Sequence, residues 1–145
     1  MSATPAKPDR FATGMNTRKQ VLGEAHVAQA EATKGDFDAP FQELITEAAW
    51  GHVWSRPGLT LRERSCITIA LLAALGCDDE FALHIRATAR TGASRDDIRE
   101  ALMHVAIYAG VPAANHAFKI AKRIFAETEG SKQNDATGKA DGSAR

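Results

Sequence analysis

Apolar residues recur every three or four positions along most of this chain, which is the spacing of an amphipathic α-helix. Gly, Pro and capping residues divide the pattern into about six helices. The expected helices cover, in chain order, about residues 15–32, 38–56, 60–75, 79–90, 94–109 and 112–129. No stretch shows the strict alternation of a β-strand. The pattern therefore predicts an all-α fold, a compact bundle whose helices are joined by short connections.

Several helix starts carry a recognisable cap. Thr60 and Glu63 form a capping box, in which each side chain accepts a hydrogen bond from an otherwise unpaired backbone N–H. The stretch 94–97 has a similar pattern, and Asp38 is expected to cap the helix that has Pro40 in its first turn. The helix after Thr60 is apolar on all sides. We expect it to be the central helix of the bundle, or to be partly buried by a partner subunit.

The two ends of the chain lack this periodicity. Residues 1–14 read as an N-terminal tail, and residues 130–145 contain no large apolar side chain. A segment that buries no apolar surface cannot offset the entropy lost on ordering, so we expect the C-terminal tail to be disordered. The sequence thus predicts one helical domain over residues 15–129, which fits a chain of 145 residues.

The composition argues against nucleic-acid and membrane partners. There are 18 Lys and Arg residues and 18 Asp and Glu residues, so the formal net charge is zero and no basic patch stands out. The longest apolar run, from Cys66 to Cys77, is too short to cross a bilayer, and the N-terminus lacks the apolar segment of a secretory signal. The two cysteines match no zinc or C-x-x-C spacing. We therefore expect a protein of the reducing cytoplasm.

Glu80 and His84 are the first candidates for chemistry. They lie four residues apart on one expected helix and therefore on one face of it. A carboxylate at this spacing can orient an imidazole and raise its pKa, which suits acid–base catalysis. The alternative is a solvated surface pair. No H-E-x-x-H motif or other cluster with metal-ligand spacing occurs, so no metal is expected.

A second group of candidates surrounds the end of the helix expected over 38–56. The segment Trp50–Gly58 holds His52, Trp54 and Arg56, and an aromatic wall with a cation suits a small anionic ligand. The alternative is a loop that plugs the end of the bundle. Arg64, in the first turns of the next helix, is the preferred anchor for a substrate carboxylate. A structural salt bridge to Glu43 or Glu47 is the alternative for Arg64.

The third group lies at the start of the last expected helix. Free backbone N–H groups near Pro112 offer a place for an oxyanion, and His116 follows about one turn later. A half-exposed structural histidine is the alternative reading of His116. Tyr108, just before this start, supplies a further apolar wall.

Four stretches of the chain carry a resemblance to a known family. They are VLGEAHV, FQELITEAAWGHVWSRPGLTLRERS, the G-x(7)-H segment that ends in LHIRAT, and AIYAGVPAANHAFKIAK. Together they cover most of residues 15–126 and resemble the carboxymuconolactone decarboxylase family, which also contains alkylhydroperoxidase-like proteins. The resemblance implies an all-α, alkylhydroperoxidase-like fold and a ring-like homo-oligomer, usually a hexamer. It also implies decarboxylation of 4-carboxymuconolactone to β-ketoadipate enol-lactone and CO2 in protocatechuate catabolism.

The redox-active members of this family carry Gly-Cys-x-x-Cys-x-x-x-His. Here Gly76, Cys77 and His84 are kept, and Glu80 stands where the second cysteine would be. Without a resolving thiol, one site cannot run a dithiol peroxidase cycle. This departure favours the decarboxylase branch. The alternatives that stay open are a thiol-dependent peroxidase or redox partner that uses Cys77, and a non-catalytic oligomeric scaffold.

The hypothesis that follows is decarboxylation without a cofactor, because the conjugated lactone accepts the electrons that CO2 leaves behind. His84 is the expected proton donor and Glu80 orients it. The expected substrate-binding residues are Arg64, Arg56, His52, Trp54, Tyr108 and His116.

Overall fold

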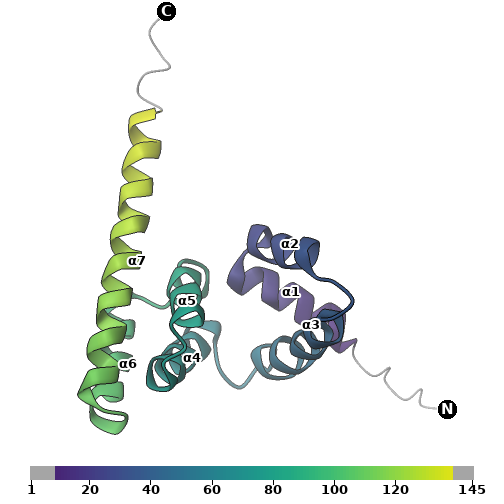
Figure 1. The fold of residues 1–145 in the computed structure, drawn as a ribbon, viewed down its shortest axis with the longest axis horizontal. Coiled ribbons are helices and arrows are strands. Elements are labelled where there is room, and N and C mark those ends of the chain that lie inside the picture. The colour runs from purple at the N-terminus through teal and green to yellow at the C-terminus, as the bar shows by residue number, and fades with distance from the viewer. Residues whose placement is uncertain (1–8, 139–145) are drawn as a thin grey trace, which may run out of the picture. The chain divides into compact units, whose positions relative to one another are not determined.

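The computed structural model describes residues 9–138, and every regular element in this span is a helix. The prediction of an all-α fold is confirmed. The elements are α1 (Arg10–Leu22), α2 (Glu24–Thr33), α3 (Ala39–Ile45), the π-helix η1 (Thr46–Trp54), α4 (Leu61–Leu75), α5 (Asp78–Thr91), α6 (Arg95–Tyr108) and α7 (Val111–Gly138) (Figure 1). No helix in this span is long and apolar enough to cross a membrane.

The helices form two compact units where the sequence indicated one bundle. Within the described residues, unit 1 comprises 9–65 and 87–93, and unit 2 comprises 66–86 and 94–138. Each unit is described by itself below. The residues expected to carry chemistry are divided between them.

In unit 1, α1 packs against α2 on one side and against η1 on the other (Figure 1). The contact with η1 is a close approach of two backbones. A Cβ on Gly14 would lie 2.0 Å from the carbonyl oxygen of Thr46, and a Cβ on Gly51 would lie 2.3 Å from that of Arg10. Only glycine fits at these two positions. Gly51 is therefore one of the two residues that allow α1 to reach η1.

The single helix expected over 15–32 is two helices. Gly23 separates α1 from α2 and has φ 91°, a conformation that L-residues other than glycine rarely adopt. Its N–H still bonds the carbonyl of Lys19 at 2.9 Å, so this carbonyl in the last turn of α1 has a donor. The expectation was wrong because the apolar pattern continues through the bend.

The helix expected over 38–56 differs from the expectation in two ways: Asp38 does not cap it, and its second half is a π-helix. Asp38 makes no side-chain capping bond, because its carboxylate instead accepts from the N–H of Gly35 at 2.7 Å. Pro40 is in the first turn, as expected. From Thr46 the helix changes to i→i+5 hydrogen bonding, which is rare and is found frequently at functional sites. The apolar pattern gives no signal for that change.

Unit 2 is built on a continuous apolar core from α4, α5, α6 and α7. Its most deeply buried side chains, each 2% exposed or less, include Ile69, Phe81, Ile85, Ile98, Leu102 and Ile124. The capping box at the start of α6 is confirmed, with the Asp97 N–H 3.0 Å from Ser94 Oγ. The box that begins α4, which starts in unit 1, is also confirmed, with the Thr60 N–H 2.8 Å from the Glu63 carboxylate.

Of the two expectations for α4, burial on every side as the central helix is wrong within the described residues, and partial burial by a partner subunit stays a prediction. Ile69 is fully buried, but Ile67, Leu71 and Leu75 are 49%, 56% and 74% exposed. The three exposed residues are spaced four apart, so they form one stripe on the helix. This stripe stays bare because the described residues of unit 2 cover only the opposite face of α4.

Both tails are shorter than expected, because the first helix begins earlier and the last helix ends later. α1 begins at Arg10, where the Asp9 carboxylate caps it by accepting from the Ala12 N–H at 3.0 Å. α7 continues to Gly138, so residues 130–138 are helical although they were expected to be disordered. Their exposed side chains bury nothing; the helix there propagates from the packed turns before it. Residues 1–8 and 139–145 lie outside the described part of the tails.

Candidate active site

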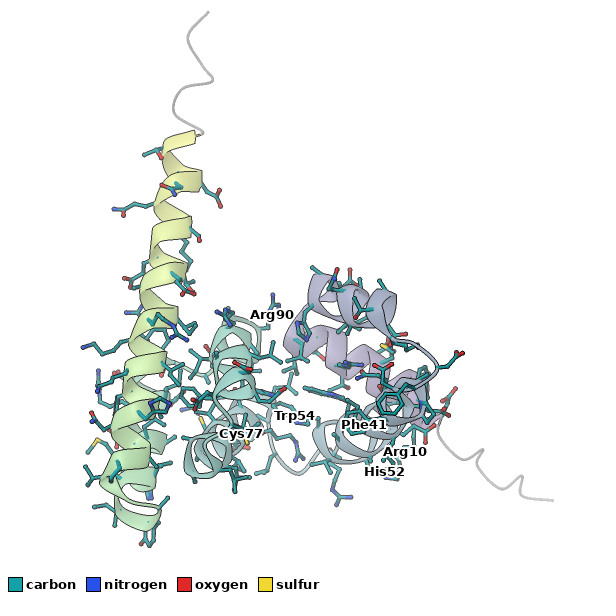
Figure 2. All side chains as sticks on the ribbon, viewed as in Figure 1. Arg10, Phe41, His52, Trp54, Cys77 and Arg90 are labelled. Carbon is teal, nitrogen blue, oxygen red and sulfur yellow. The ribbon has the colours of Figure 1, made fainter. Side chains whose placement is uncertain are left out.

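The end of η1 carries both tryptophans of the chain. The ring centroids of Trp50 and Trp54 lie 5.1 Å apart with a tilt of 31°, and the two residues are only 6% and 8% exposed. His52, between them in sequence, is exposed (Figure 2). Trp54 is therefore buried against Trp50, whereas His52 lies on the open side of η1. The loop that follows turns at Ser55 and leads to Arg56.

Two of the expected carboxylate-binding arginines are linked directly. Arg64 Nη2 donates to the backbone carbonyl of Arg56 at 2.9 Å. Arg64 makes no ion pair with Glu43 or Glu47 in the described part of the chain, so the alternative reading of a structural salt bridge is wrong. The guanidinium is held in place by a neutral oxygen, and its charge is left without a carboxylate partner among residues 9–138. Such a group is suited to bind an anion.

His84 lies deep in unit 2. It is 7% exposed, on the same helix as the buried core residues Phe81 and Ile85. Burial penalises the charged imidazolium and lowers the pKa of His84 from 6.5 to about 4. Glu80, one turn earlier, is exposed. The expectation that Glu80 raises the pKa of His84 is therefore wrong, because desolvation dominates over a carboxylate that sits in water.

His116 and Tyr108 have partners that the sequence analysis did not name. His116 Nε2 lies 2.8 Å from the Asp78 carboxylate, an exposed pair that ties the start of α7 to the first turn of α5. The reading of His116 as a half-exposed structural residue is the one that the geometry favours. Tyr108 is 85% exposed, and its ring stacks on that of His104 with centroids 6.2 Å apart. Tyr108 also lines an open hollow of about 470 Å³ on unit 2, together with Met103 and Ile107.

The eight expected site residues thus fall into two groups of four. Unit 1 holds the arginines and the aromatic wall, and its members are His52, Trp54, Arg56 and Arg64. Unit 2 holds the titratable pair and the residues near the start of α7, namely Glu80, His84, Tyr108 and His116. The structure joins Arg56 to Arg64 and places Glu80 and His84 on one helix. It pairs Tyr108 and His116 with other residues.

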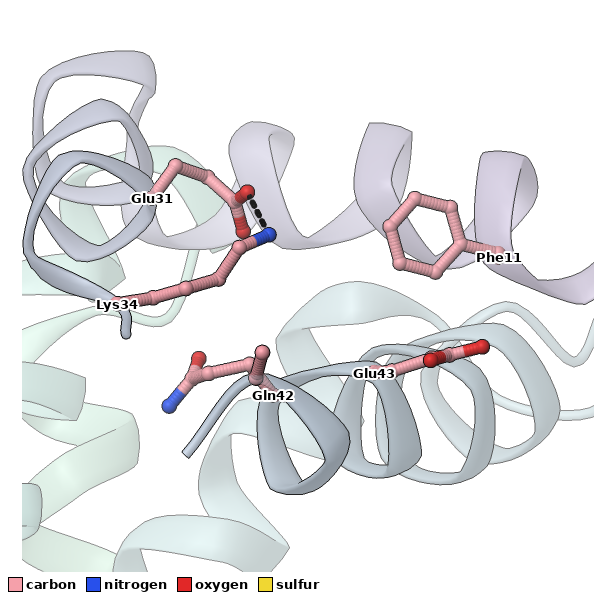
Figure 3. Close-up of a pocket in the computed structure, with 6 residues that line it drawn as sticks. Phe11, Glu31, Lys34, Gln42 and Glu43 are labelled. Atoms are coloured by element: carbon pink, nitrogen blue, oxygen red, sulfur yellow. Dashed lines mark hydrogen bonds and ion pairs between the residues drawn. The ribbon is translucent and has the colours of Figure 1, made fainter. Parts of the chain in front are cut away.

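A well-formed hollow elsewhere in unit 1 does not suit an anionic substrate. It has a volume of about 240 Å³ between α1, α2 and α3 (Figure 3). Its lining residues are Phe11, Glu31, Lys34, Ala39, Gln42 and Glu43. Lys34 already pairs with Glu31 at 2.6 Å, so the second carboxylate, of Glu43, leaves the lining net negative. A dicarboxylate would be repelled there.

Between residues 9 and 138, no three or more His, Cys, Asp and Glu side chains lie together so as to hold a metal ion. Cys66 and Cys77 are half-buried and are not joined in a disulfide.

The sequence reasoning missed three side chains that shape these groups. Ser55 directly follows η1, and Asp78 is 38 residues from its partner His116, so neither carries a signal in the pattern. His104 does carry one, because it precedes Tyr108 by four residues on a helix, a spacing that indicates contact.

Known proteins similar to this chain agree with the resemblance noted in the sequence. The carboxymuconolactone decarboxylase family matches residues 39–123. The chain is 44% identical over 116 residues to 4-carboxymuconolactone decarboxylase of Acinetobacter baylyi, which covers 80% of this chain and 87% of that protein. It is 40% identical over 115 residues to nitrosuccinic acid decarboxylase of Metarhizium robertsii, with 79% and 80% covered. It is also 45% identical over 42 residues to 4-carboxymuconolactone decarboxylase of Pseudomonas putida, with 29% and 88% covered. Because the family match spans more than half of the sequence and the first two alignments cover most of both partners, this chain belongs to the carboxymuconolactone decarboxylase family.

Proposed function

We propose that this protein converts 4-carboxymuconolactone to β-ketoadipate enol-lactone and CO2 without a cofactor. The observation that carries the proposal is the 44% identity, over 87% of its length, to a relative named for this activity. The geometry supports it, because the Arg64 guanidinium is held by the backbone of Arg56, which follows the buried Trp54 by two residues. A substrate with two carboxylates on an apolar ring matches that combination.

The chemistry needs little beyond the substrate itself. When the C–C bond to the carboxylate breaks, its electron pair moves through the ring C=C to the lactone carbonyl, giving a dienolate and CO2. One proton then adds to the ring carbon next to that carbonyl. The protein has to bind the carboxylates, stabilise the dienolate oxygen and allow one proton to reach the ring carbon. No step requires an added electron sink.

Arg64 and Arg56 are assigned to the substrate carboxylates, with the exposed His52 as a helper at the rim. Arg64 is the main anchor because its guanidinium is already fixed by the Arg56 carbonyl and loses little freedom on binding. Trp54 supplies apolar wall, which disfavours the localised charge of the leaving carboxylate more than the delocalised charge of the dienolate. Tyr108 is assigned a second wall. His116 is left out, because its Nε2 is paired with Asp78.

His84 is assigned a neutral role. With a pKa of about 4, forming the imidazolium at pH 7 costs about 4 kcal/mol, so the role of charged proton donor is disfavoured. A neutral imidazole N–H can still donate a hydrogen bond to the dienolate oxygen as its charge develops. The proton that reaches the ring carbon comes from solvent, with the exposed Glu80 as the relay.

A second substrate is favoured by a specific observation, the 40% identity to nitrosuccinic acid decarboxylase. Nitrosuccinate also loses CO2 from a carbon that bears an electron sink, in this case a nitro group, and also carries a second carboxylate for an arginine. The same residues would serve both reactions. Supplying each substrate separately and comparing kcat/KM decides between them.

The protein is proposed to work as a homo-oligomer, a hexamer, in the cytoplasm. The bare apolar stripe of Ile67, Leu71 and Leu75 supports assembly, because contiguous exposed apolar surface marks contact sites. Cys66 and Cys77 form no disulfide within residues 9–138, which fits a reducing compartment. Light scattering of the purified protein, with Leu71→Glu as the disrupting variant, tests the assembly.

The function is tested by adding 4-carboxymuconolactone to purified protein in D2O and measuring CO2 and enol-lactone. We expect turnover with one deuterium at the ring carbon next to the carbonyl.

Arg64→Met should raise KM roughly 10- to 100-fold, the worth of a charged hydrogen-bonded contact. His84→Asn should lower kcat, whereas His26→Asn, at an exposed position on α2, should not. Cys77→Ser should stay active. If wild-type protein is folded and releases no CO2 from either substrate, the proposal is wrong.

A further inference from the structure

The end of η1 is fixed by a side chain rather than by the backbone alone. The last carbonyls of any helix lack intrahelical partners and need other donors. Ser55 Oγ lies 2.6 Å from the carbonyl oxygen of Trp50 and donates to it. Ser55 therefore sets where the π-helix stops and where the following loop begins.

A residue from α1 completes this arrangement. Thr17 Oγ1 lies 2.7 Å from Ser55 Oγ. Because the Ser55 hydroxyl hydrogen is already directed at the Trp50 carbonyl, the Thr17 hydroxyl must be the donor in this second bond. The two hydroxyls thus form a relay with one direction, from Thr17 through Ser55 to the carbonyl of Trp50.

The relay ends next to the candidate anion site. Arg56 directly follows Ser55, and its carbonyl oxygen accepts the hydrogen bond from Arg64 Nη2 at 2.9 Å. A change in the backbone torsions of Ser55 or Arg56 would move that carbonyl and release the Arg64 guanidinium. All of these residues belong to unit 1, so the path from Thr17 to Arg64 runs within one compact body.

We propose that Thr17 is a positioning residue for substrate binding: through Ser55 it fixes the Arg56 carbonyl and so aims the Arg64 guanidinium at the substrate carboxylate. The inference rests on the proposed function for the identity of the anion. Thr17 is not needed to hold α1 against η1. The close approach at Gly14 and Gly51 and the bond from Arg10 Nη1 to the Gly51 carbonyl do that separately.

The kinetic test compares Thr17→Val, which keeps the shape and removes the hydroxyl, with Thr17→Ser, which keeps the hydroxyl. Thr13→Val is the matched control, because Thr13 lies one turn earlier on α1 and its hydroxyl makes no hydrogen bond within residues 9–138. We expect Thr17→Val to raise KM about tenfold with kcat within about twofold, since the arginine contact is kept from ground state to transition state. Thr17→Ser and Thr13→Val should keep the wild-type KM.

A second readout does not depend on activity. The chain has two tryptophans and both lie in η1, so intrinsic fluorescence reports this element alone. We expect Thr17→Val to increase acrylamide quenching of tryptophan emission and Thr17→Ser to leave it unchanged. If wild-type protein fails to decarboxylate the lactone, the proposed function falls, and this readout still decides whether Thr17 fixes the end of η1.

Ser55→Ala breaks the same relay from its other side and replaces Thr17→Val if that variant does not fold. The double variant should be no worse than either single variant, because the two hydroxyls act in series. The proposal is overturned if folded Thr17→Val has wild-type KM and quenching, or if Thr17→Ser is as impaired as Thr17→Val. It is also overturned if the double variant shows the product of two independent defects.

Discussion

The two units of this protein are stabilised by different kinds of contact. Unit 2 encloses large apolar side chains, such as Phe81 and Leu102, at 1% exposure or less. Unit 1 brings α1 and η1 together at backbone distance through Gly14, and polar groups flank that contact. One of them is Arg18, which is only 4% exposed and bonds the neutral side chains of Gln42 and Thr46 at 3.1 and 3.4 Å.

This difference suggests that unit 2 contributes most of the folding stability, whereas the packing of unit 1 fixes the orientation of its helices. An apolar core is stabilised by area and tolerates small shifts of its side chains. Directional hydrogen bonds and a glycine contact allow only one register between two helices. Unit 1, which carries the candidate carboxylate anchors, therefore has the kind of packing that fixes direction, and unit 2 supplies most of the buried apolar surface. The variants below test this division, and the first concerns the core of unit 2.

Phe81→Ala should cost about 4 kcal/mol of unfolding free energy, because it removes a nearly fully buried aromatic side chain and leaves a cavity. The matched control is Phe37→Ala in unit 1. Phe37 is fully exposed, so its loss should change stability by less than about 0.5 kcal/mol. Urea unfolding followed by circular dichroism measures both. Equal costs for the two variants would contradict the assignment of the core to unit 2.

His84 gives unit 2 a stability that depends on pH. Its pKa is about 4 in the folded protein and 6.5 in the unfolded chain, so the unfolded state binds the proton first as pH falls. Stability is therefore complete above pH 6.5 and declines between pH 6.5 and 4, by about 3 kcal/mol in total.

Urea midpoints at pH 7.5 and pH 4.5 measure this loss. His84→Asn should remove most of the difference, whereas His26→Asn, at an exposed position in unit 1, should keep it. A His84→Asn variant with the full wild-type dependence on pH would show that other groups cause it.

Gly14→Ala tests the backbone contact of unit 1. The added Cβ would meet the Thr46 carbonyl, and backbone cannot rotate away, so we expect a loss of about 2 kcal/mol. Gly130→Ala is the control, because its Cβ meets nothing within 4 Å and alanine favours a helix interior. That variant should be neutral or stabilised by up to about 1 kcal/mol. Thermal unfolding of both proteins against wild type gives the comparison.

The smallest expected effect concerns helix starts. Ser94→Ala in unit 2 removes a capping box and should cost about 1 kcal/mol. Asp38→Ala in unit 1 removes no helix cap, only an exposed bond to the Gly35 N–H, and should cost less than about 0.5 kcal/mol. The same urea measurements apply. If Asp38→Ala lowered the unfolding free energy more than Ser94→Ala does, Asp38 would have to be capping its helix after all.

The parts that sequence reasoning predicted correctly rest on local rules. Both capping boxes and the all-α fold follow from residues close to one another in sequence. The errors arise where tertiary contacts decide. The break at Gly23 does not interrupt the apolar pattern, and the π-helical bonding of η1 leaves the same residues apolar that an α-helix would. Those features depend on what α1 packs against.

The site was predictable only in its residue types. Arg64 and His84 were identified from spacing and resemblance, but their environments were not. The sequence cannot show that a carbonyl eight residues away holds Arg64, because the loop between them has no regular geometry. The sign of the pKa shift at His84 was missed because Glu80 lies in water, and burial of the imidazole follows from packing across several helices.

The length of α7 has a consequence for local opening. Its first half buries Ala114, Ala117 and Ile124, whereas every residue from 126 to 137 is exposed. Glu127 and Glu129 still pair with Arg86 and Arg95, but residues 130–137 are held only by hydrogen bonds within the helix, and such ends open without unfolding anything else. Backbone amides should therefore exchange with deuterium in a gradient along one continuous helix, slowest near Ile124 and fastest toward Gly138.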